Sequence, residues 1–133
     1  MSSSALSELF QTSHTIAVVG LSSKRSRPSY GVSQYLQMNG YRVIPVNPLE
    51  AEVLGEKSYP DLDSIPEKID IVDIFRRSEY VPDIVDAAIR VGARCVWMQE
   101  GVVHEDAAAK ARSAGLMVVM DRCTLKEHRR LLR

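Results

Sequence analysis

A regular alternation of short apolar runs with longer amphipathic segments constrains the fold of this chain more than any other feature. Each run ends in turn-forming or polar residues, and the runs span residues 15–20, 42–46, 69–75, 94–98 and 116–120. Short runs that are apolar nearly throughout are typical of strands buried on both faces of a parallel sheet. The sequence therefore predicts five such strands.

The segments between the runs have the spacing of amphipathic helices. Apolar residues recur on one face in segments 29–39, 79–91 and 104–114, and a glycine follows each segment, as it does many helices. Two further helices are expected. One covers about 4–11, and the other begins at Thr124, which has capping-box spacing to Glu127.

Only the stretch 48–66 lacks a strong period. We expect a short strand near 56–59 and a short helix near 61–65 within it. Repeated strand–helix–strand units predict an α/β fold, specifically a Rossmann-like three-layer sandwich with helices on both faces of a mostly parallel sheet. The expected sheet has five to six strands in the order 3-2-1-4-5-6, with a short third strand. A length of 133 residues fits one domain over 1–133.

Composition argues against several classes of protein. The 17 basic and 17 acidic residues cancel, whereas nucleic-acid-binding domains carry a basic excess. No apolar run reaches the length of a membrane span, and the first residues lack a signal-peptide pattern, so a cytoplasmic location is expected. The two cysteines, Cys95 and Cys123, have no metal-ligand spacing, and no metal is expected.

The charges cancel overall but not locally. Residues 1–45 carry four basic and one acidic side chain, whereas residues 46–75 carry eight acidic and two basic ones. A basic surface beside an acidic one suits a small anionic ligand better than a polymer. The alternative is a mixed, solvated surface.

Ligands of such sheets bind beyond the carboxyl ends of the strands, where the strand order reverses. The loop after the first strand, 20–29, has three basic residues and four serines, and it leads directly into a helix. Free N–H groups and the helix dipole favour a phosphate at that position. The loop is neither a GxGxxG nor a Walker A motif. The other interpretation is a solvated loop in which Ser29 caps the helix.

The next two loops also offer groups for a nucleotide. Asn47 stands where NAD-binding domains usually place an acidic residue that holds the ribose, and Pro48 provides a flat surface for adenine. A simple Asx–Pro turn is an equal alternative. Arg76 and Arg77 follow the third buried strand directly, and arginine is the preferred partner of phosphate.

The last two loops contain Gln99 and Glu100, which offer polar contacts, and Cys123, which lies near a helix N-terminus where thiols gain reactivity. The favoured interpretation of Cys123 is nevertheless a partly buried thiol without chemistry. The sequence contains no recognisable pair of a catalytic nucleophile and a base. The histidines, which are His14, His104 and His128, are expected at the surface.

Several motifs in order resemble one family. The run VGLSSKRSRPSYGVSQYLQMNGYRVIPVNP (19–48) resembles the opening of the small CoA-binding proteins, which are stand-alone versions of the CoA-binding domain of the succinyl-CoA synthetase alpha subunit. GEKSYP (55–60), DIVDIF (70–75), WMQEG (97–101) and DRC (121–123) follow the same pattern. The resemblance covers about 16–128.

The resemblance implies a cytoplasmic Rossmann-like domain that binds coenzyme A or an acyl-CoA, a small anionic nucleotide ligand, without ligase chemistry. It places phosphates at Ser22–Arg25, the pantetheine near Met98–Glu100, and the nucleotide beside Asn47 and Pro48. One departure is that Leu49 and Glu50 stand where related sequences often have lysine, so Arg27 or Arg76 is expected to substitute.

Together, the loops and the resemblance define the candidate cofactor-binding set: Gly20, Leu21, Ser22, Ser23, Lys24, Arg25, Arg27, Ser29, Tyr30, Val46, Asn47, Pro48, Phe75, Arg76, Arg77, Met98, Gln99 and Glu100. Two other hypotheses remain open. One is an enzyme or subunit that depends on NAD(P) or another nucleotide. The other is a mixed disulfide between Cys123 and the CoA thiol. No nucleic acid or membrane partner is expected, and the sequence does not identify a protein partner.

Overall fold

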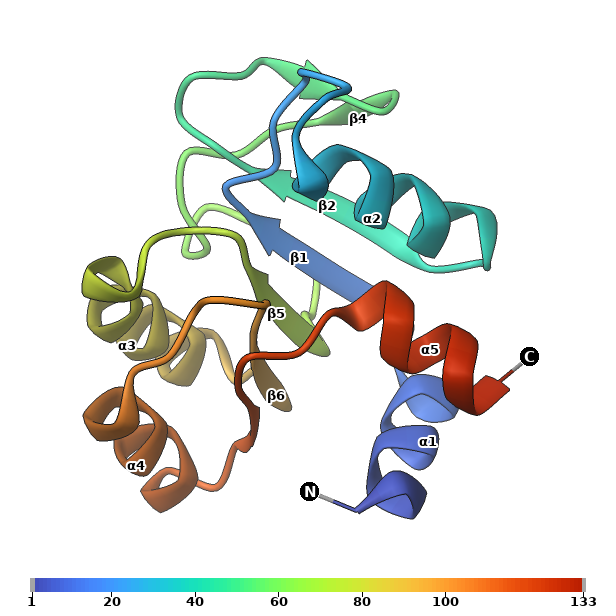
Figure 1. Ribbon diagram of the computed structural model, residues 1–133. Helices are drawn as coiled ribbons and strands as arrows, with labels where there is room; N and C mark the ends of the chain where they lie inside the picture. The colour runs from blue at the N-terminus through green and yellow to red at the C-terminus, as the bar shows by residue number, and fades with distance from the viewer. Residues whose placement is uncertain (1, 133) are drawn as a thin grey trace.

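The computed structural model describes residues 2–132, and a parallel sheet forms its centre (Figure 1). The strands of the sheet are β1 (Thr15–Val19), β2 (Arg42–Val46), β5 (Ile71–Ile74), β6 (Cys95–Met98) and β7 (Met117–Val119). All neighbours pair in parallel, in the order β2-β1-β5-β6-β7. The predicted Rossmann-like α/β fold is confirmed, and each strand lies within a predicted run.

Helices cover both faces of the sheet (Figure 1). One face carries α1 (Ser3–Thr12), α2 (Pro28–Met38) and α5 (Thr124–Leu132), and the other carries α3 (Val81–Val91) and α4 (Glu105–Ser113). A 3₁₀ turn, η1 (Ser78–Tyr80), leads into α3. None of the helices within residues 2–132 has the length and apolar character needed to cross a membrane.

Alternation along the strands separates two cores. In β1, Ile16 and Val18 pack beneath α1, α2 and α5, whereas Ala17 and Val19 pack beneath α3 and α4. Because side chains alternate between the faces of a strand, five short apolar strands supply both cores. The same alternation turns Asp73 of β5 toward the α1, α2 and α5 layer, where it contacts Thr124.

The predicted third strand is reduced to a single bridge. Tyr59 forms one parallel bridge with Val46 at the edge of β2. The residues before it instead form an antiparallel hairpin from β3 (Glu52–Val53) and β4 (Glu56–Lys57). The predicted helix near 61–65 is wrong. A turn replaces it: the Asp61 carboxylate accepts the Ser64 N–H at 2.9 Å, but Pro66 disfavours a helical conformation at Ile65, so no helix continues.

Neither of the two helix caps considered from the sequence is present. The N-cap of α2 is Arg27, and Ser29 lies inside the first turn. Thr124 is the first residue of α5, but its hydroxyl donates to Asp73 at 3.1 Å rather than closing a capping box with Glu127. A buried carboxylate lies within its reach, and pairing with that group outweighs a local cap.

His128 is a further correction, because it is 6% exposed rather than on the surface. A hydrogen bond of 2.7 Å joins its Nδ1 to the Tyr35 hydroxyl, and the rings of Phe10, Tyr35 and Tyr41 surround it. Burial lowers the pKa of its imidazole. This contact ties α5 to α2. His104 caps α4 by accepting the Ala107 N–H at 3.1 Å.

Candidate functional site

A cleft of about 990 Å³ lies at the carboxyl edge of the sheet. The chain runs from β1 outward to β2 and then crosses back to β5 on the other side of β1, so the strand order reverses between β1 and β5. Loops after all five strands contribute to the cleft wall. The residues that line it are Gly20, Ser22, Lys24, Arg27, Pro28, Ser29, Val32, Asn47, Pro48, Leu49, Glu50, Phe75, Arg76, Arg77, Gln99, Glu100, Gly101, Val102 and Cys123.

Gly20 permits the close approach of two loops at this reversal. Its φ is +90°, and its N–H donates to the Val46 carbonyl at 2.8 Å. A Cβ at this position would lie 2.6 Å from the carbonyl oxygen of Phe75. Only glycine combines this φ with such a backbone contact. The close approach of the loops that follow β1 and β5 therefore depends on Gly20.

The helix that follows opens its N-terminus into the cleft. Arg27, Pro28 and Ser29 all line the cleft, and no side chain caps this end of α2. The Ser29 hydroxyl accepts the Ser22 N–H at 3.1 Å, which folds the loop back on the helix and leaves the hydroxyl hydrogen available. An uncapped helix end with nearby cations is well suited to an anion.

A carboxylate already contacts this loop. Glu50 accepts the Ser23 N–H at 2.7 Å, and that hydrogen bond is the main reason why the pKa of Glu50 is lowered. Lys24 also favours the ionised carboxylate. The residue that departs from the related sequences therefore places a negative charge at the loop where phosphates are predicted.

Arginines form the wall after β5. The Arg76 guanidinium lies 4.3 Å from the centre of the Tyr80 ring, and Arg77 donates to the Tyr80 hydroxyl at 3.3 Å. The aromatic ring thus holds both cations beside the cleft. Arg76 also lines a second cavity of about 310 Å³ beneath α3.

Asn47 lines the cleft, but its side chain is engaged within the chain. Its Nδ2 donates to the Leu21 carbonyl at 3.0 Å, and its Oδ1 accepts the Leu49 N–H at 3.0 Å. The Asx turn considered from the sequence is therefore present. Each atom still keeps one further hydrogen-bonding position for a ligand, because Nδ2 carries two hydrogens and Oδ1 two lone pairs.

A buried polar network forms the floor. The two hydrogens of Gln99 Nε2 are donated to Asp73 at 2.6 Å and to Thr124 at 2.9 Å, and Thr124 donates to Asp73. Asp73 is completely buried, and desolvation raises its pKa to about 7. The hydrogen bonds from Gln99 and Thr124 oppose that increase. This network joins β5, the loop after β6 and α5.

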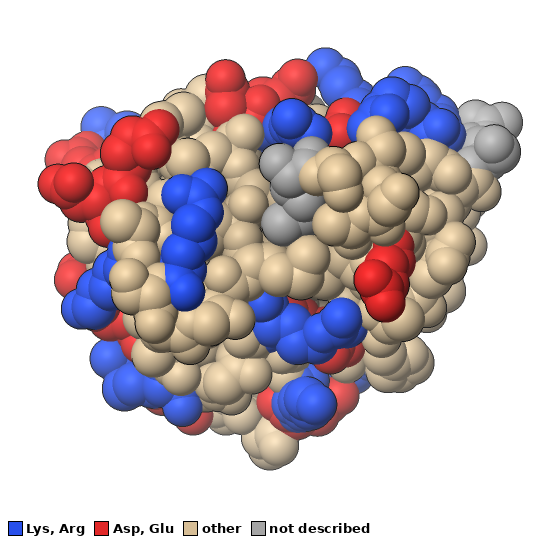
Figure 2. All heavy atoms as spheres, turned by 90° about the horizontal axis from the view of Figure 1, so that it is seen from below, with Lys and Arg blue, Asp and Glu red and all other residues tan. Residues whose placement is uncertain are grey.

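Exposed cations define the rim. Lys24, Arg27 and Arg77 are exposed, whereas Ser29, Val32 and Gln99 lie at the buried floor. Among the lining residues four are basic and two are acidic, and one of the acidic residues, Glu100, is paired with Lys126 at 3.0 Å. The face in Figure 2 instead shows Lys and Arg interspersed with Asp and Glu.

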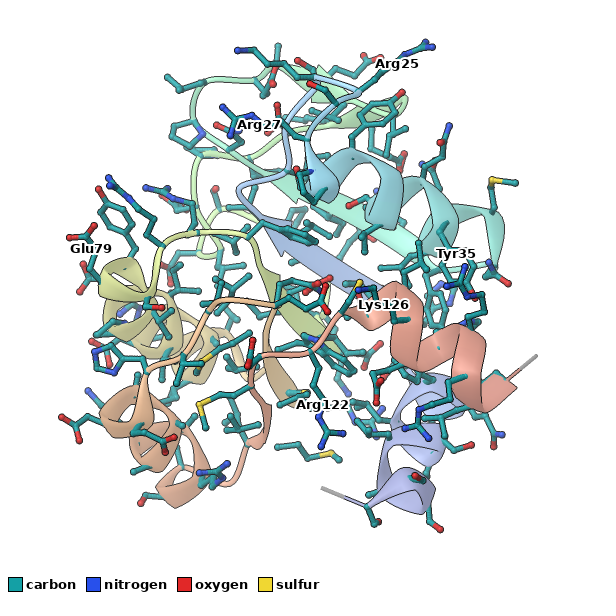
Figure 3. The ribbon with its side chains drawn as sticks, viewed as in Figure 1. Arg25, Arg27, Tyr35, Glu79, Arg122 and Lys126 are labelled. Atoms are coloured by element: carbon teal, nitrogen blue, oxygen red, sulfur yellow. The ribbon has the colours of Figure 1, made fainter. Side chains whose placement is uncertain are left out.

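Most of the predicted site residues come together in this cleft, and six do not line it. Leu21 and Met98 are fully buried in the cores, and Val46 lines the second cavity. Arg25 points outward from the loop (Figure 3). Ser23 donates to Glu50, and Tyr30 is half-buried in α2.

The structure adds seven lining residues to the predicted set, namely Pro28, Val32, Leu49, Glu50, Gly101, Val102 and Cys123. Most of them stand directly beside predicted residues in the same loops. Val32 is one helical turn after Pro28, so the helical period of α2 was the signal that could have identified it.

The fold and the cleft define a Rossmann-like α/β protein with an anion-suited crevice at the reversal of strand order. The model of a family described as "CoA binding domain" matches residues 14–129. The chain belongs to this family, and the resemblance found in the sequence is confirmed.

Similar proteins agree with that assignment. The uncharacterized protein YneT of Bacillus subtilis (strain 168) is 41% identical over 127 residues, which cover 96% of this chain and 94% of YneT. A hypothetical protein from Pyrococcus horikoshii OT3 has a TM-score of 0.98 and 41% identity, with coverage of 100% of this chain and 94% of the other.

A larger protein also contains this fold. The dinucleotide-forming acetyl-coenzyme A synthetase 1 of Ca. Korarchaeum cryptofilum matches with a TM-score of 0.74 and 28% identity. The match covers 85% of this chain but 27% of that synthetase. This chain is thus homologous to one part of the synthetase.

Proposed function

We propose that the protein binds coenzyme A, free or acylated, in the cleft at the carboxyl edge of the sheet. The observation that carries the proposal is that one cleft joins an open helix N-terminus and four cations to a buried floor. Coenzyme A is a 3′-phosphorylated ADP with a neutral pantetheine arm, so it presents an anionic end and an amide-containing end. The family and the synthetase homologue support this ligand class.

The anionic end and the pantetheine end of coenzyme A would each meet complementary groups in the cleft. The phosphates would lie at the Ser22–Ser29 loop and at Arg76, where N–H groups and guanidinium groups meet. The arm would follow Val32 and Val102 toward Gln99, since these residues are buried and line the same cleft. The proposed role is binding, with no catalytic step assigned to these residues.

A thermal-shift series tests this proposal. A ligand at 100 times its Kd adds about 2.7 kcal/mol to the free energy of unfolding, which corresponds to an increase in Tm of roughly 10 °C for a domain of this size. We expect such an increase with coenzyme A and acetyl-CoA, and a smaller one with dephospho-CoA, which lacks the 3′-phosphate.

NAD and NADP serve as the comparison ligands in that series. Both are dinucleotides that lack a pantetheine arm and so cannot contact the buried floor as coenzyme A would. We therefore expect each to raise Tm less than coenzyme A does. The absence of any increase with coenzyme A would contradict the proposal. A larger increase with NADP would favour a nucleotide-dependent enzyme instead.

Replacing Glu50 with glutamine is expected to tighten coenzyme A binding. The amide oxygen can still accept the Ser23 N–H, but the negative charge beside the phosphate loop is gone. We expect a Kd roughly threefold to tenfold lower at low ionic strength, and a smaller gain at high salt, because exposed charges are screened. Isothermal titration calorimetry measures both.

Glu52→Gln is the matched control, because Glu52 is exposed and does not line the cleft. Its Kd should equal that of the wild type. Weaker binding by the Glu50→Gln variant would show that this carboxylate supports the ligand rather than competing with it.

A further inference from the structure

Cys123 lies in the wall of the cleft, at the start of α5. Its side chain is 8% exposed, and it is the one cysteine among residues 2–132 that lines the cleft. The preceding backbone is fixed, because Trp97 Nε1 donates to the Arg122 carbonyl at 2.8 Å. The thiol is therefore held at one place on the wall.

An unsatisfied acceptor in the same cleft points to a ligand. Gln99 is 4% exposed, and the two hydrogens of its Nε2 are used by Asp73 and Thr124. Its amide oxygen accepts no hydrogen bond from any group within residues 2–132. Because this oxygen has no partner among those residues and Gln99 lines the cleft, it can accept an N–H from a ligand there.

Gln99 lies beside the residue that follows Cys123. Gln99 contacts Thr124, the next residue after Cys123, and both Gln99 and Cys123 line the cleft. The pantetheine arm of coenzyme A carries two amide N–H groups and ends in a thiol. An arm that donates to the Gln99 oxygen therefore brings its sulfur to the part of the cleft where Cys123 lies.

The surroundings also favour a reactive thiol. Cys123 immediately precedes α5, whose first N–H groups form the positive end of the helix dipole. Lys126 is on the first turn of this helix, near the centre of Figure 3, and its ammonium group pairs with Glu100 at the cleft rim. A helix N-terminus and a nearby lysine are features of reactive cysteines.

We propose that Cys123 forms a mixed disulfide with the pantetheine thiol of coenzyme A, by exchange with a coenzyme A disulfide bound in the cleft. This proposal rests on the proposed function. The Cys123 thiolate attacks one sulfur of the ligand disulfide, so a new S–S bond forms as the original S–S bond breaks. The second coenzyme A leaves as a thiolate and takes up the proton that Cys123 lost. The ligand disulfide is the oxidant, and no other is needed.

Cys95 provides an internal contrast. It is fully buried in β6, and desolvation raises its pKa far above the ordinary value, so its thiolate is not formed at neutral pH. Cys95 does not line the cleft. Modification is therefore expected at Cys123 alone.

Intact mass spectrometry tests the proposal. The reduced protein is incubated with coenzyme A disulfide, and in parallel with glutathione disulfide at the same concentration. We expect a single addition equal to coenzyme A less two hydrogens, reversed by dithiothreitol and mapped to the Cys123 peptide. The rate should exceed that with glutathione disulfide by at least about tenfold, because binding in the cleft raises the effective concentration.

Three results would overturn the proposal: no addition to a wild-type protein whose Tm rises with coenzyme A, equal rates with both disulfides, or addition that persists in a Cys123→Ser variant. Cys95→Ala should still be modified. A protein whose Tm does not respond to coenzyme A shows instead that the proposed function itself fails. Peptide mapping of the wild type locates the adduct even if the variants fold poorly.

Discussion

Replacing Gly20 with alanine is expected to destabilise the protein by roughly 3 kcal/mol and to abolish coenzyme A binding. The φ of +90° strains any residue with a Cβ, and that Cβ would lie 2.6 Å from the Phe75 carbonyl oxygen. Because the contact is with backbone, relief requires β1 and the loop after β5 to separate. That movement deforms the cleft at the point where both loops enter it.

Urea denaturation and calorimetric titration measure the two effects. Gly31→Ala is the matched control, because Gly31 lies inside α2 with nothing within 4 Å of an added Cβ and without a positive φ. Alanine there should be neutral or stabilise by up to about 1 kcal/mol. A Gly20→Ala variant with wild-type stability and affinity would show that the backbone at Gly20 and the Phe75 carbonyl do not approach as closely as the structure indicates.

Replacing Asp73 with asparagine is expected to remove a large pH dependence of stability. The carboxyl group is completely buried, and desolvation raises its pKa from 3.8 to about 7. Between these values the folded protein keeps a proton that the unfolded chain has released. The free energy of unfolding therefore falls as pH rises from about 4 to 7, and it levels off above that range.

The size of this effect follows from the shift. A difference of about three units between the folded and unfolded pKa values corresponds to roughly 4 kcal/mol in the free energy of unfolding, at about 1.4 kcal/mol per unit. Asparagine can accept from Gln99 through its amide oxygen, and its amide N–H can donate to the Thr124 hydroxyl once that hydroxyl accepts instead of donating, but asparagine does not ionise. The Asp73→Asn variant should thus be the more stable protein at pH 8, with the difference shrinking toward pH 4.

Urea titrations at several pH values measure that difference. Asp63→Asn is the control, because Asp63 is exposed and its hydrogen bond with Arg90 lowers its pKa, so it stays ionised over this range. It should leave the slope between pH 4 and pH 8 unchanged. An Asp73→Asn variant that follows the wild-type slope would mean that the buried carboxyl group does not hold its proton.

The strands were predictable because their signal is local. A strand buried on both faces is apolar nearly throughout, so the composition of runs such as 42–46 already indicates that they are buried. The glycines after α2, α3 and α4 were equally local signals for helix ends. The third strand formed only in part, because its pairing depends on distant residues: residues 56–57 are a strand but pair with 52–53, and Tyr59 alone bridges to Val46 of β2.

The cleft was predictable from topology, and its floor was not. Knowing that strand ends meet at one edge was enough to bring Ser22, Asn47, Arg76 and Gln99 to one cleft. The network around Asp73 requires knowledge of which face of β5 it occupies and of where α5 docks. An acidic residue inside an apolar run was the available signal, since a buried carboxyl group needs partners.

The same distinction explains His128. Charged residues flank it in the sequence, which indicates a solvated helix, and its burial arises from packing against Phe10, Tyr35 and Tyr41. Three separate parts of the chain make that pocket, so no local pattern reports it. Tertiary packing overrides local polarity at such positions.

The hydrogen bonds of Thr124 to Asp73 and Gln99 make the floor of the cleft depend on the docking of α5. The Ser22–Ser29 loop and Thr124 lie far apart in the sequence, so the wall and the floor of the cleft come from distant parts of the chain. The floor is therefore complete only when α5 is packed beside β5, and a local opening of α5 would expose Asp73 while leaving β1, β2 and their loops in place.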